Sequence, residues 1–221
     1  MYSEAYESYD STNRILSVFT DNMMRRKAAE EVIKKKPYKI LDIATGTGDS
    51  AILLSRLSVE KGIRMEIIGI DANYNMLKIA REKANKENIG NIKFVMGDAL
   101  NMKYEDNSFD AAICSFALKN FLDIDKFVME VKRVIKKNGK FVVLDISNPQ
   151  KSMGKVPFYI YIAYMSIFGM LTGKKLYKWL PGSTSAFNRK EFITILRKNR
   201  LRNIRIREFL FGISYIISCD K

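Results

Sequence analysis

The fold of this chain is decided by residues 39–49, which read KILDIATGTGD. An apolar run over residues 38–43 stops at a glycine-rich turn, and a helical pattern of apolar residues follows over 48–58. A strand that leads through such a turn into a helix forms a ligand-binding shelf in α/β folds. Gly46 and Gly48 tolerate positive φ and allow close approach to the backbone, and the helix start favours polar or anionic atoms. An ordinary βα turn is the alternative, because a glycine-rich turn alone is a weak signal.

Two later acidic residues make the ligand more specific. Asp71 follows an apolar run over 65–70 and lies 23 residues after Gly48, close to the ~20 expected for a residue that binds ribose hydroxyls. Asp98 follows a third run over 92–96, where a carboxylate can accept a hydrogen bond from an exocyclic amine such as that of adenine. The third position after Gly48 is Ala51, so the turn lacks the last glycine of the dinucleotide fingerprint. The pattern argues against NAD and favours S-adenosylmethionine.

These motifs resemble those of the class I S-adenosylmethionine-dependent methyltransferases. More narrowly, the chain resembles the ubiquinone/menaquinone biosynthesis C-methyltransferase family. The segments that carry the narrower resemblance are 9–17 (YDSTNRILS), 75–78 (NMLK), 115–120 (SFALKN), 133–136 (RVIK) and 145–147 (DIS). The family usually has a histidine and a tryptophan where this chain has Asp21 and Met24. This departure leaves the methyl acceptor open.

The periodicity predicts alternating strands and helices. Strands are expected at 38–43, 65–70, 92–96, 109–115 and 139–146, and helices at 11–19, 22–35, 48–58, 74–87 and 124–136, with Gly139 as a helix C-cap. Alternation of this kind implies a parallel sheet with helices on both faces. A helix that starts near Asn188 and a hairpin over 204–209 and 213–218 follow. The resemblance implies a Rossmann-like three-layer α/β sandwich whose mostly parallel seven-stranded sheet has an antiparallel last strand.

We expect one domain with four parts. Residues 1–36 form an N-terminal helical cap, 37–150 the cofactor-binding core, 151–188 a helical lid, and 189–221 the helix and hairpin that complete the sheet. Residues 156–171 are uncharged over sixteen positions and are flanked by lysines, whereas a membrane span needs ~20 apolar residues. One prediction for this run is an apolar helical lid that touches a membrane carrying a lipid acceptor. The alternative is a buried lid helix that does not touch a membrane.

The expected site residues follow from the strand ends and the resemblance. The predicted cofactor-binding residues are Ala44, Gly46, Thr47, Gly48, Asp71, Ala72, Asp98, Ala99 and Ser115. The predicted catalytic residues are Tyr9, Asn13, Asp21 and Asn120. The chain has no histidine, so neither a histidine-based metal site nor histidine acid–base chemistry is expected, and we expect no metal. A phenol titrates near ~10, so Asp21, Tyr9 or a water must act as base, or Arg25 and Arg26 must favour the phenolate.

Composition limits the partners and the compartment. Thirty-eight Lys and Arg residues exceed 24 Asp and Glu residues and give a net charge of +14, which indicates an anionic partner or simply a lysine-rich proteome. The Asn/Asp-Pro-Pro-aromatic loop of DNA adenine methyltransferases is absent from the sequence after 109–115, so DNA is not expected. Two cysteines imply no disulfide framework and a reducing compartment. We expect a cytoplasmic protein, peripheral on the inner membrane face, and leave a homodimer open.

Three functions compete at this point. The first is C-methylation of a prenylated quinol precursor of the menaquinone or ubiquinone type, as the resemblance implies. The second is methylation of another small or lipid-like molecule, because Asp21 and Met24 depart from the family. The third is an RNA-binding methyltransferase or binding module, which only the charge of +14 suggests.

Overall fold

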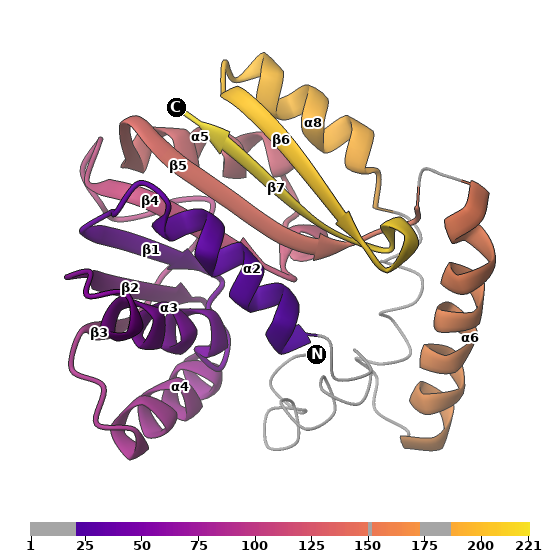
Figure 1. Ribbon diagram of the computed structural model, residues 1–221, viewed down its shortest axis with the longest axis horizontal. Coiled ribbons are helices and arrows are strands. Elements are labelled where there is room, and N and C mark those ends of the chain that lie inside the picture. The colour runs from indigo at the N-terminus through magenta and orange to yellow at the C-terminus, as the bar shows by residue number, and fades with distance from the viewer. Residues whose placement is uncertain (1–20, 150–151, 173–186) are drawn as a thin grey trace.

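The computed structural model describes residues 21–149, 152–172 and 187–221 (Figure 1). The expected helix at 11–19 and the expected site residues Tyr9 and Asn13 lie outside these ranges. The helix expected at 22–35 is α2, Asp21–Ile33.

A seven-stranded sheet organises the molecule, with the strand order β3-β2-β1-β4-β5-β7-β6. The strands are β1 (Lys39–Ile43), β2 (Glu66–Asp71), β3 (Ile92–Met96), β4 (Phe109–Ser115), β5 (Ile135–Ile146), β6 (Arg202–Phe209) and β7 (Ser214–Asp220). The first five strands pair in parallel, and β7 runs antiparallel between β5 and β6. The predicted mostly parallel sheet with an antiparallel last strand is therefore confirmed. The carboxyl ends of β1, β2 and β4 meet at one edge, where ligands bind in such sheets.

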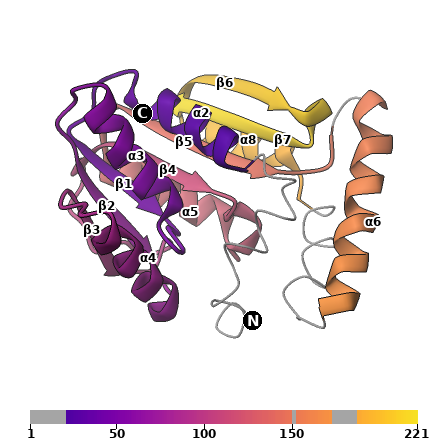
Figure 2. The same cartoon turned by 60° about the horizontal axis from the view of Figure 1, so that its bottom comes forward.

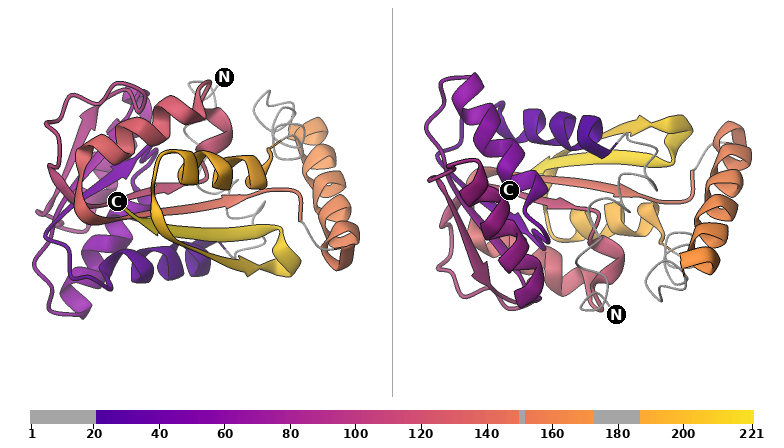
Figure 3. Two further views of the ribbon diagram at one scale, coloured as in Figure 1. Left: turned by 90° about the horizontal axis from the view of Figure 1, so that it is seen from above. Right: turned by 90° about the horizontal axis from the view of Figure 1, so that it is seen from below.

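Helices cover both faces of this sheet. On one face lie α2, α3 (Asp49–Glu60) and α4 (Tyr74–Lys86), and on the other lie α5 (Ile124–Val134) and α8 (Arg189–Lys198), as Figures 2 and 3 show. Three of these helices begin at side-chain N-caps, because Asn73, Asp123 and Asn188 accept hydrogen bonds from amides of the first turn. Such caps satisfy amides that have no partner within the helix.

Two apolar cores hold the three layers together. Successive strand residues point to opposite faces, so Leu41 and Ile43 pack in the core under α5 and α8, whereas Ile40 packs under α2, α3 and α4. All three are fully buried. Near-continuous apolar runs, rather than strict alternation, are typical of a parallel sheet covered on both sides, and this explains why the strands could be read from the sequence.

The connection from α5 to β5 differs from its prediction. The helix was expected to reach 136 with Gly139 as its C-cap, but it ends at Val134 and β5 begins at Ile135. Asn138, with φ 62°, takes the left-handed conformation instead. Gly139 is required for another reason: a Cβ there would lie 2.7 Å from the carbonyl oxygen of Lys136 and 3.0 Å from that of Asp110. The glycine allows β5 to pass close to β4.

The segment after β5 contains α6 (Lys155–Thr172), which stands at the far end of the molecule from β3 (Figure 1). It is preceded by the short 3-10 helix η4 (Ser152–Gly154), which packs against the 3-10 helix η5 (Leu210–Gly212). A Cβ on Gly154 would lie 2.2 Å from the carbonyl oxygen of Phe211, so this contact excludes any larger residue. Within the described residues, no helix has the length and apolar character needed to cross a membrane.

Candidate functional site

The turn between β1 and α3 has the left-handed conformations that its sequence predicts. Ala44, Gly46 and Gly48 have φ values of 53°, 57° and 83°, and Gly48 is the N-cap of α3. A Cβ on Gly48 would lie 2.8 Å from the Phe94 ring, whereas a Cβ on Gly46 would meet no atom within 4 Å. Gly48 is thus needed for packing, and Gly46 faces the open space in which a ligand can approach the backbone.

A second feature is Asp71, which joins the ends of β1 and β2. Its Oδ2 accepts a hydrogen bond from the amide of Gly46 at 2.8 Å, and its Oδ1 accepts one from the amide of Asn73 at 2.8 Å. Burial raises the pKa of Asp71, and the amides of Asn73, Gly46 and Ala72 oppose the shift. A carboxylate has about four acceptor sites, and these three amides leave one of them, so Asp71 can both order the turn and accept a hydrogen bond from a ribose.

A third feature is Asp98, which follows β3, the strand beside β2 in the sheet. The side chain of Asp98 is exposed and its Oδ1 accepts a hydrogen bond from the amide of Leu100 at 2.8 Å. Ala99 is 8% exposed, and Ala72 is exposed after β2. The amide of Gly97 donates to the carbonyl of Asp71 at 3.0 Å, which places the ends of β2 and β3 side by side. The structure therefore brings the predicted ribose and adenine positions to one edge.

Behind the turn lies Asp42, a carboxylate with 1% exposure. Its Oδ2 accepts a hydrogen bond from the Thr45 hydroxyl at 2.6 Å. Burial raises the pKa of Asp42 to about 7, while Thr45, Arg25 and the amide of Ala51 act in the opposite direction. Asp42 thus holds the turn from beneath and does not face the open space.

A hydrogen-bonded chain links α2, α3 and β4. Arg25 Nη1 donates to the Ser50 hydroxyl at 2.8 Å, and Ser50 donates to the Ser115 hydroxyl at 3.0 Å. The Arg25 guanidinium lies 4.9 Å from the centroid of the Phe116 ring, a cation–π distance. Phe116 has φ 58°, which turns the chain away from β4 immediately after Ser115. Ser50 lies 65 residues from Ser115, so no sequence spacing indicated this contact.

A buried ion pair lies beyond Ser115. Lys119 Nζ lies 3.4 Å from Asp145 Oδ1, and the two side chains are 5% and 1% exposed. Asp145 also accepts hydrogen bonds from the amides of Leu118 at 3.0 Å and Ile146 at 2.8 Å. It therefore fixes the 3-10 helix η3 (Leu118–Asn120) to the end of β5. Lys119 was missed by the sequence prediction, which named its exposed neighbour Asn120, although its position after β4 was a usable signal.

Thr47 lies in the turn before α3 and is 3% exposed, and the other expected residues within the described ranges lie on α2. Asp21 is the first residue of the helix and is 6% exposed, while Met24 is 2% exposed and packs in the core under α3. Arg26, suggested with Arg25 to favour a phenolate, instead pairs on the surface with Glu60 at 2.7 Å and Glu30 at 3.3 Å. The two neighbouring arginines thus have separate surroundings.

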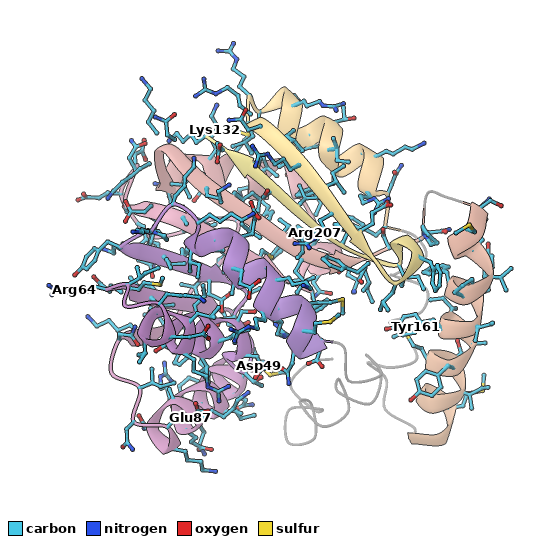
Figure 4. The ribbon with its side chains drawn as sticks, viewed as in Figure 1. Asp49, Arg64, Glu87, Lys132, Tyr161 and Arg207 are labelled. Atoms are coloured by element: carbon cyan, nitrogen blue, oxygen red, sulfur yellow. The ribbon has the colours of Figure 1, made fainter. Side chains whose placement is uncertain are left out.

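Asp49, labelled in Figure 4 at the start of α3, pairs with Lys83.

These residues fit an adenosine ligand with a charged amino-acid end. The edge offers open space at Gly46, acidic residues after β2 and β3, and a cation on α2. Among the described residues, no group of three or more His, Cys, Asp or Glu side chains could hold a metal ion.

Comparison with known proteins identifies close sequence relatives. A model of the ubiE/COQ5 methyltransferase family matches residues 1–220. A demethylmenaquinone methyltransferase of Deinococcus radiodurans is 35% identical over 100% of this chain and 91% of its own length. One of Thermus thermophilus is 34% identical over 100% of both chains.

Solved structures share the fold. An S-adenosylmethionine-dependent methyltransferase from Thermotoga maritima has a TM-score of 0.70 at 18% identity and covers 100% of both chains. One from Aquifex aeolicus has a TM-score of 0.62 at 21% identity and covers 87% of this chain and 88% of its own. The expected class I methyltransferase fold is therefore confirmed.

Proposed function

The chain belongs to the ubiE/COQ5 methyltransferase family and is an enzyme that uses S-adenosylmethionine, and we propose that it methylates a ring carbon of a prenylated quinol precursor of the menaquinone type. The observation that carries the acceptor is the name shared by its relatives, which are demethylmenaquinone methyltransferases at 34–35% identity over the whole of this chain. Another small or lipid-like acceptor is the alternative, because Asp21 and Met24 depart from the family pattern.

The cofactor supplies a methyl group on a sulfonium, and the protein must align the acceptor with it. Alignment of the two reactants supplies much of the rate in such a displacement. In the proposed site the quinol lies over the ends of β4 and β5, next to Ser115 and the η3 turn that Asp145 fixes. The buried position of Asp145 supports this role, since a rigid turn preserves the geometry of the acceptor.

A ring carbon of a quinol becomes a good nucleophile when the neighbouring hydroxyl loses its proton. The ammonium of Lys119 supports this step, because a cation in a buried position favours the charged form of a nearby phenol. Asp145 balances this charge when the acceptor is absent. Asp21, buried at the start of α2, is the described carboxylate that we propose as base; the other expected bases include Tyr9, outside the described residues.

Labelled cofactor tests the proposal. The purified protein is incubated with S-adenosylmethionine labelled in its methyl group and with a demethylated prenyl quinol, and the label is located by mass spectrometry. We expect label on a ring carbon. Label on RNA or on a polar metabolite, with none on the quinol, would show that the acceptor is wrong while the methyltransferase activity stands.

A substitution separates the acceptor site from the cofactor site. Lys119→Gln should lower turnover with little change in cofactor affinity, because Lys119 acts on the acceptor. Lys126→Gln, an exposed lysine on the nearby helix α5, is the matched control and should leave both unchanged. Equal activity of the two variants would remove Lys119 from the mechanism.

We also propose that α6 delivers a lipid-soluble acceptor by touching a membrane from the cytoplasmic side. The helix buries Phe158 and Met165, yet exposes a second apolar face in which Val156 is 70%, Ile160 65% and Ile167 57% exposed. Tyr161 lies on the side of α6 toward the body of the protein (Figure 4), and burial raises its pKa. A helix that is apolar on both faces supports one contact with protein and another with lipid.

Liposome sedimentation tests this contact. Ile160→Glu combined with Ile167→Glu should release the protein from vesicles with anionic lipids. Val59→Glu is the control, because Val59 is 81% exposed on α3 and lies outside the proposed surface. Failure of the unmodified protein to sediment with anionic or neutral vesicles would leave α6 as a lid only.

A further inference from the structure

Arg25 is a cation at the cofactor edge whose hydrogen-bonding capacity is not used by the described residues. Its guanidinium has five N–H donors, and one of them bonds Ser50. Its Nε is buried and has no hydrogen-bond partner. A buried donor without a partner costs roughly 1–3 kcal/mol, so a site that keeps one is expected to use it when a ligand binds.

The charges around Arg25 also favour binding of a ligand at its guanidinium. Among the described residues, no carboxylate forms an ion pair with Arg25, whereas the next residue, Arg26, pairs with both Glu60 and Glu30. Asp42 is near enough for Arg25 to influence its pKa, but burial raises that pKa to about 7. Asp42 is therefore largely protonated below neutral pH and does not fully balance the guanidinium. The guanidinium therefore has no full counter-charge among the described residues, and an anionic ligand could supply one.

We propose that Arg25 binds the carboxylate of the methionine part of S-adenosylmethionine. The guanidinium is held over the turn that receives the cofactor by Ser50 on α3 and by the ring of Phe116 after β4. A planar guanidinium bonds a carboxylate through two parallel N–H donors, and Nε is available as one of them. This inference depends on the cofactor and not on the proposed acceptor.

The contact has a structural consequence. Arg25 lies on α2, and Ser50 passes its hydrogen bond to Ser115 at the end of β4. Binding of the carboxylate therefore connects α2 to the strand end on which the acceptor is proposed to lie. Loss of the cofactor carboxylate should loosen α2, which a measurement of amide exchange over residues 21–33 can detect.

A binding cycle tests the proposal directly. Calorimetry compares S-adenosylmethionine with its decarboxylated form, which keeps the adenosine and the sulfonium and lacks only the carboxylate. The proteins are the unmodified chain, Arg25→Gln, Arg25→Lys and Arg26→Gln. Arg25→Gln should weaken S-adenosylmethionine binding about 10- to 100-fold, the range for a hydrogen bond to a charged group, and change the binding of the decarboxylated form by less than about twofold.

The controls make the outcomes exclusive. Arg26→Gln should leave both affinities unchanged, since Arg26 is engaged on the surface by Glu60. Arg25→Lys keeps the positive charge but lacks the paired N–H donors of the guanidinium, so it should lose less affinity for S-adenosylmethionine than Arg25→Gln. If Arg25→Gln does not fold, the comparison is made with Arg25→Lys alone. Equal losses for both ligands, or no loss for S-adenosylmethionine, would overturn the proposal.

Discussion

The Oδ2 atom of Asp71 accepts a hydrogen bond from the amide of Gly46 at 2.8 Å, so the end of β2 holds the turn that follows β1. The two residues are 25 positions apart, yet the parallel pairing of β1 with β2 brings them together. One carboxylate thereby orders the glycine turn and remains available to a ribose.

Asp71→Ala should weaken S-adenosylmethionine binding by about 1.5–3 kcal/mol, the range for hydrogen bonds to charged groups. Calorimetry with the unmodified protein and the variant measures the change. Glu105→Ala removes an exposed carboxylate elsewhere and should have no effect. If Asp71→Ala and the unmodified protein bind alike, Asp71 does not contact the ribose.

Gly48→Ala should destabilise the fold more than Gly62→Ala. Both glycines have positive φ, so either alanine has a backbone cost of roughly 1–2 kcal/mol. Only at Gly48 would the new Cβ meet the Phe94 ring, at 2.8 Å, whereas Gly62 has no atom within 4 Å. Overpacking adds about 1–3 kcal/mol, and urea denaturation of both variants should show that difference. Equal losses would mean that Phe94 moves aside freely.

The pH dependence of stability should carry a contribution from Asp42. Burial raises its pKa to about 7 in the folded chain, from ~3.9 in an unfolded chain. Between these values the folded state binds more protons than the unfolded state, so the free energy of unfolding should fall as pH rises from about 4 to about 7. The stabilising contribution of Asp42 is fully present below the pKa of the unfolded chain and is lost above the pKa of the folded chain.

Asp42→Asn should flatten this part of the profile, measured by urea denaturation at a series of pH values. The amide also replaces one oxygen of the protonated carboxyl group with an NH2 donor, so the variant is expected to be less stable at pH 4. Glu82→Gln, at an exposed position on α4, should keep the slope of the unmodified protein. If the free energy of unfolding of Asp42→Asn still falls with pH over this range, another titrating group causes the pH dependence.

Lys119 and Asp145 should be strongly coupled. Removing one partner of a buried ion pair commonly lowers the free energy of unfolding by about 3–5 kcal/mol. Asp145 keeps two backbone hydrogen bonds when Lys119 is removed. We therefore expect Lys119→Met to lower the free energy of unfolding by an amount at the lower end of this range. A double-mutant cycle with Asp145→Asn measures the coupling. The control pair, Lys136 and Asp110, is 2.7 Å apart with 48% and 26% exposed side chains and should show about 0.2–1 kcal/mol. Similar couplings would contradict the burial argument.

Part of the candidate site was accessible to sequence reasoning and part was not. Gly46, Asp71 and Asp98 each follow an apolar run, and the ends of parallel strands meet at one edge, so their proximity could be predicted. Ser50 lies inside a helix and has no such local signal, whereas Lys119 follows a predicted strand and only its partner Asp145 was not predictable. Gly139 was assigned a cap because Asn-Gly after a helix is typical of one, but the close approach of β4 explains it.

By itself the sequence determined the class of fold and the order of most elements, because a strand, a glycine turn and a helix are local patterns of 2 and 3.6 residue periodicity. The acidic residues after the strands and the resemblance to a known family indicated the cofactor. Only the tertiary structure decided which charges meet. Arg25 reaches Ser50 and Ser50 reaches Ser115 across 25 and 65 residues, and Lys119 reaches Asp145 across 26. Such contacts depend on strand order and helix placement, which no single segment of the chain encodes.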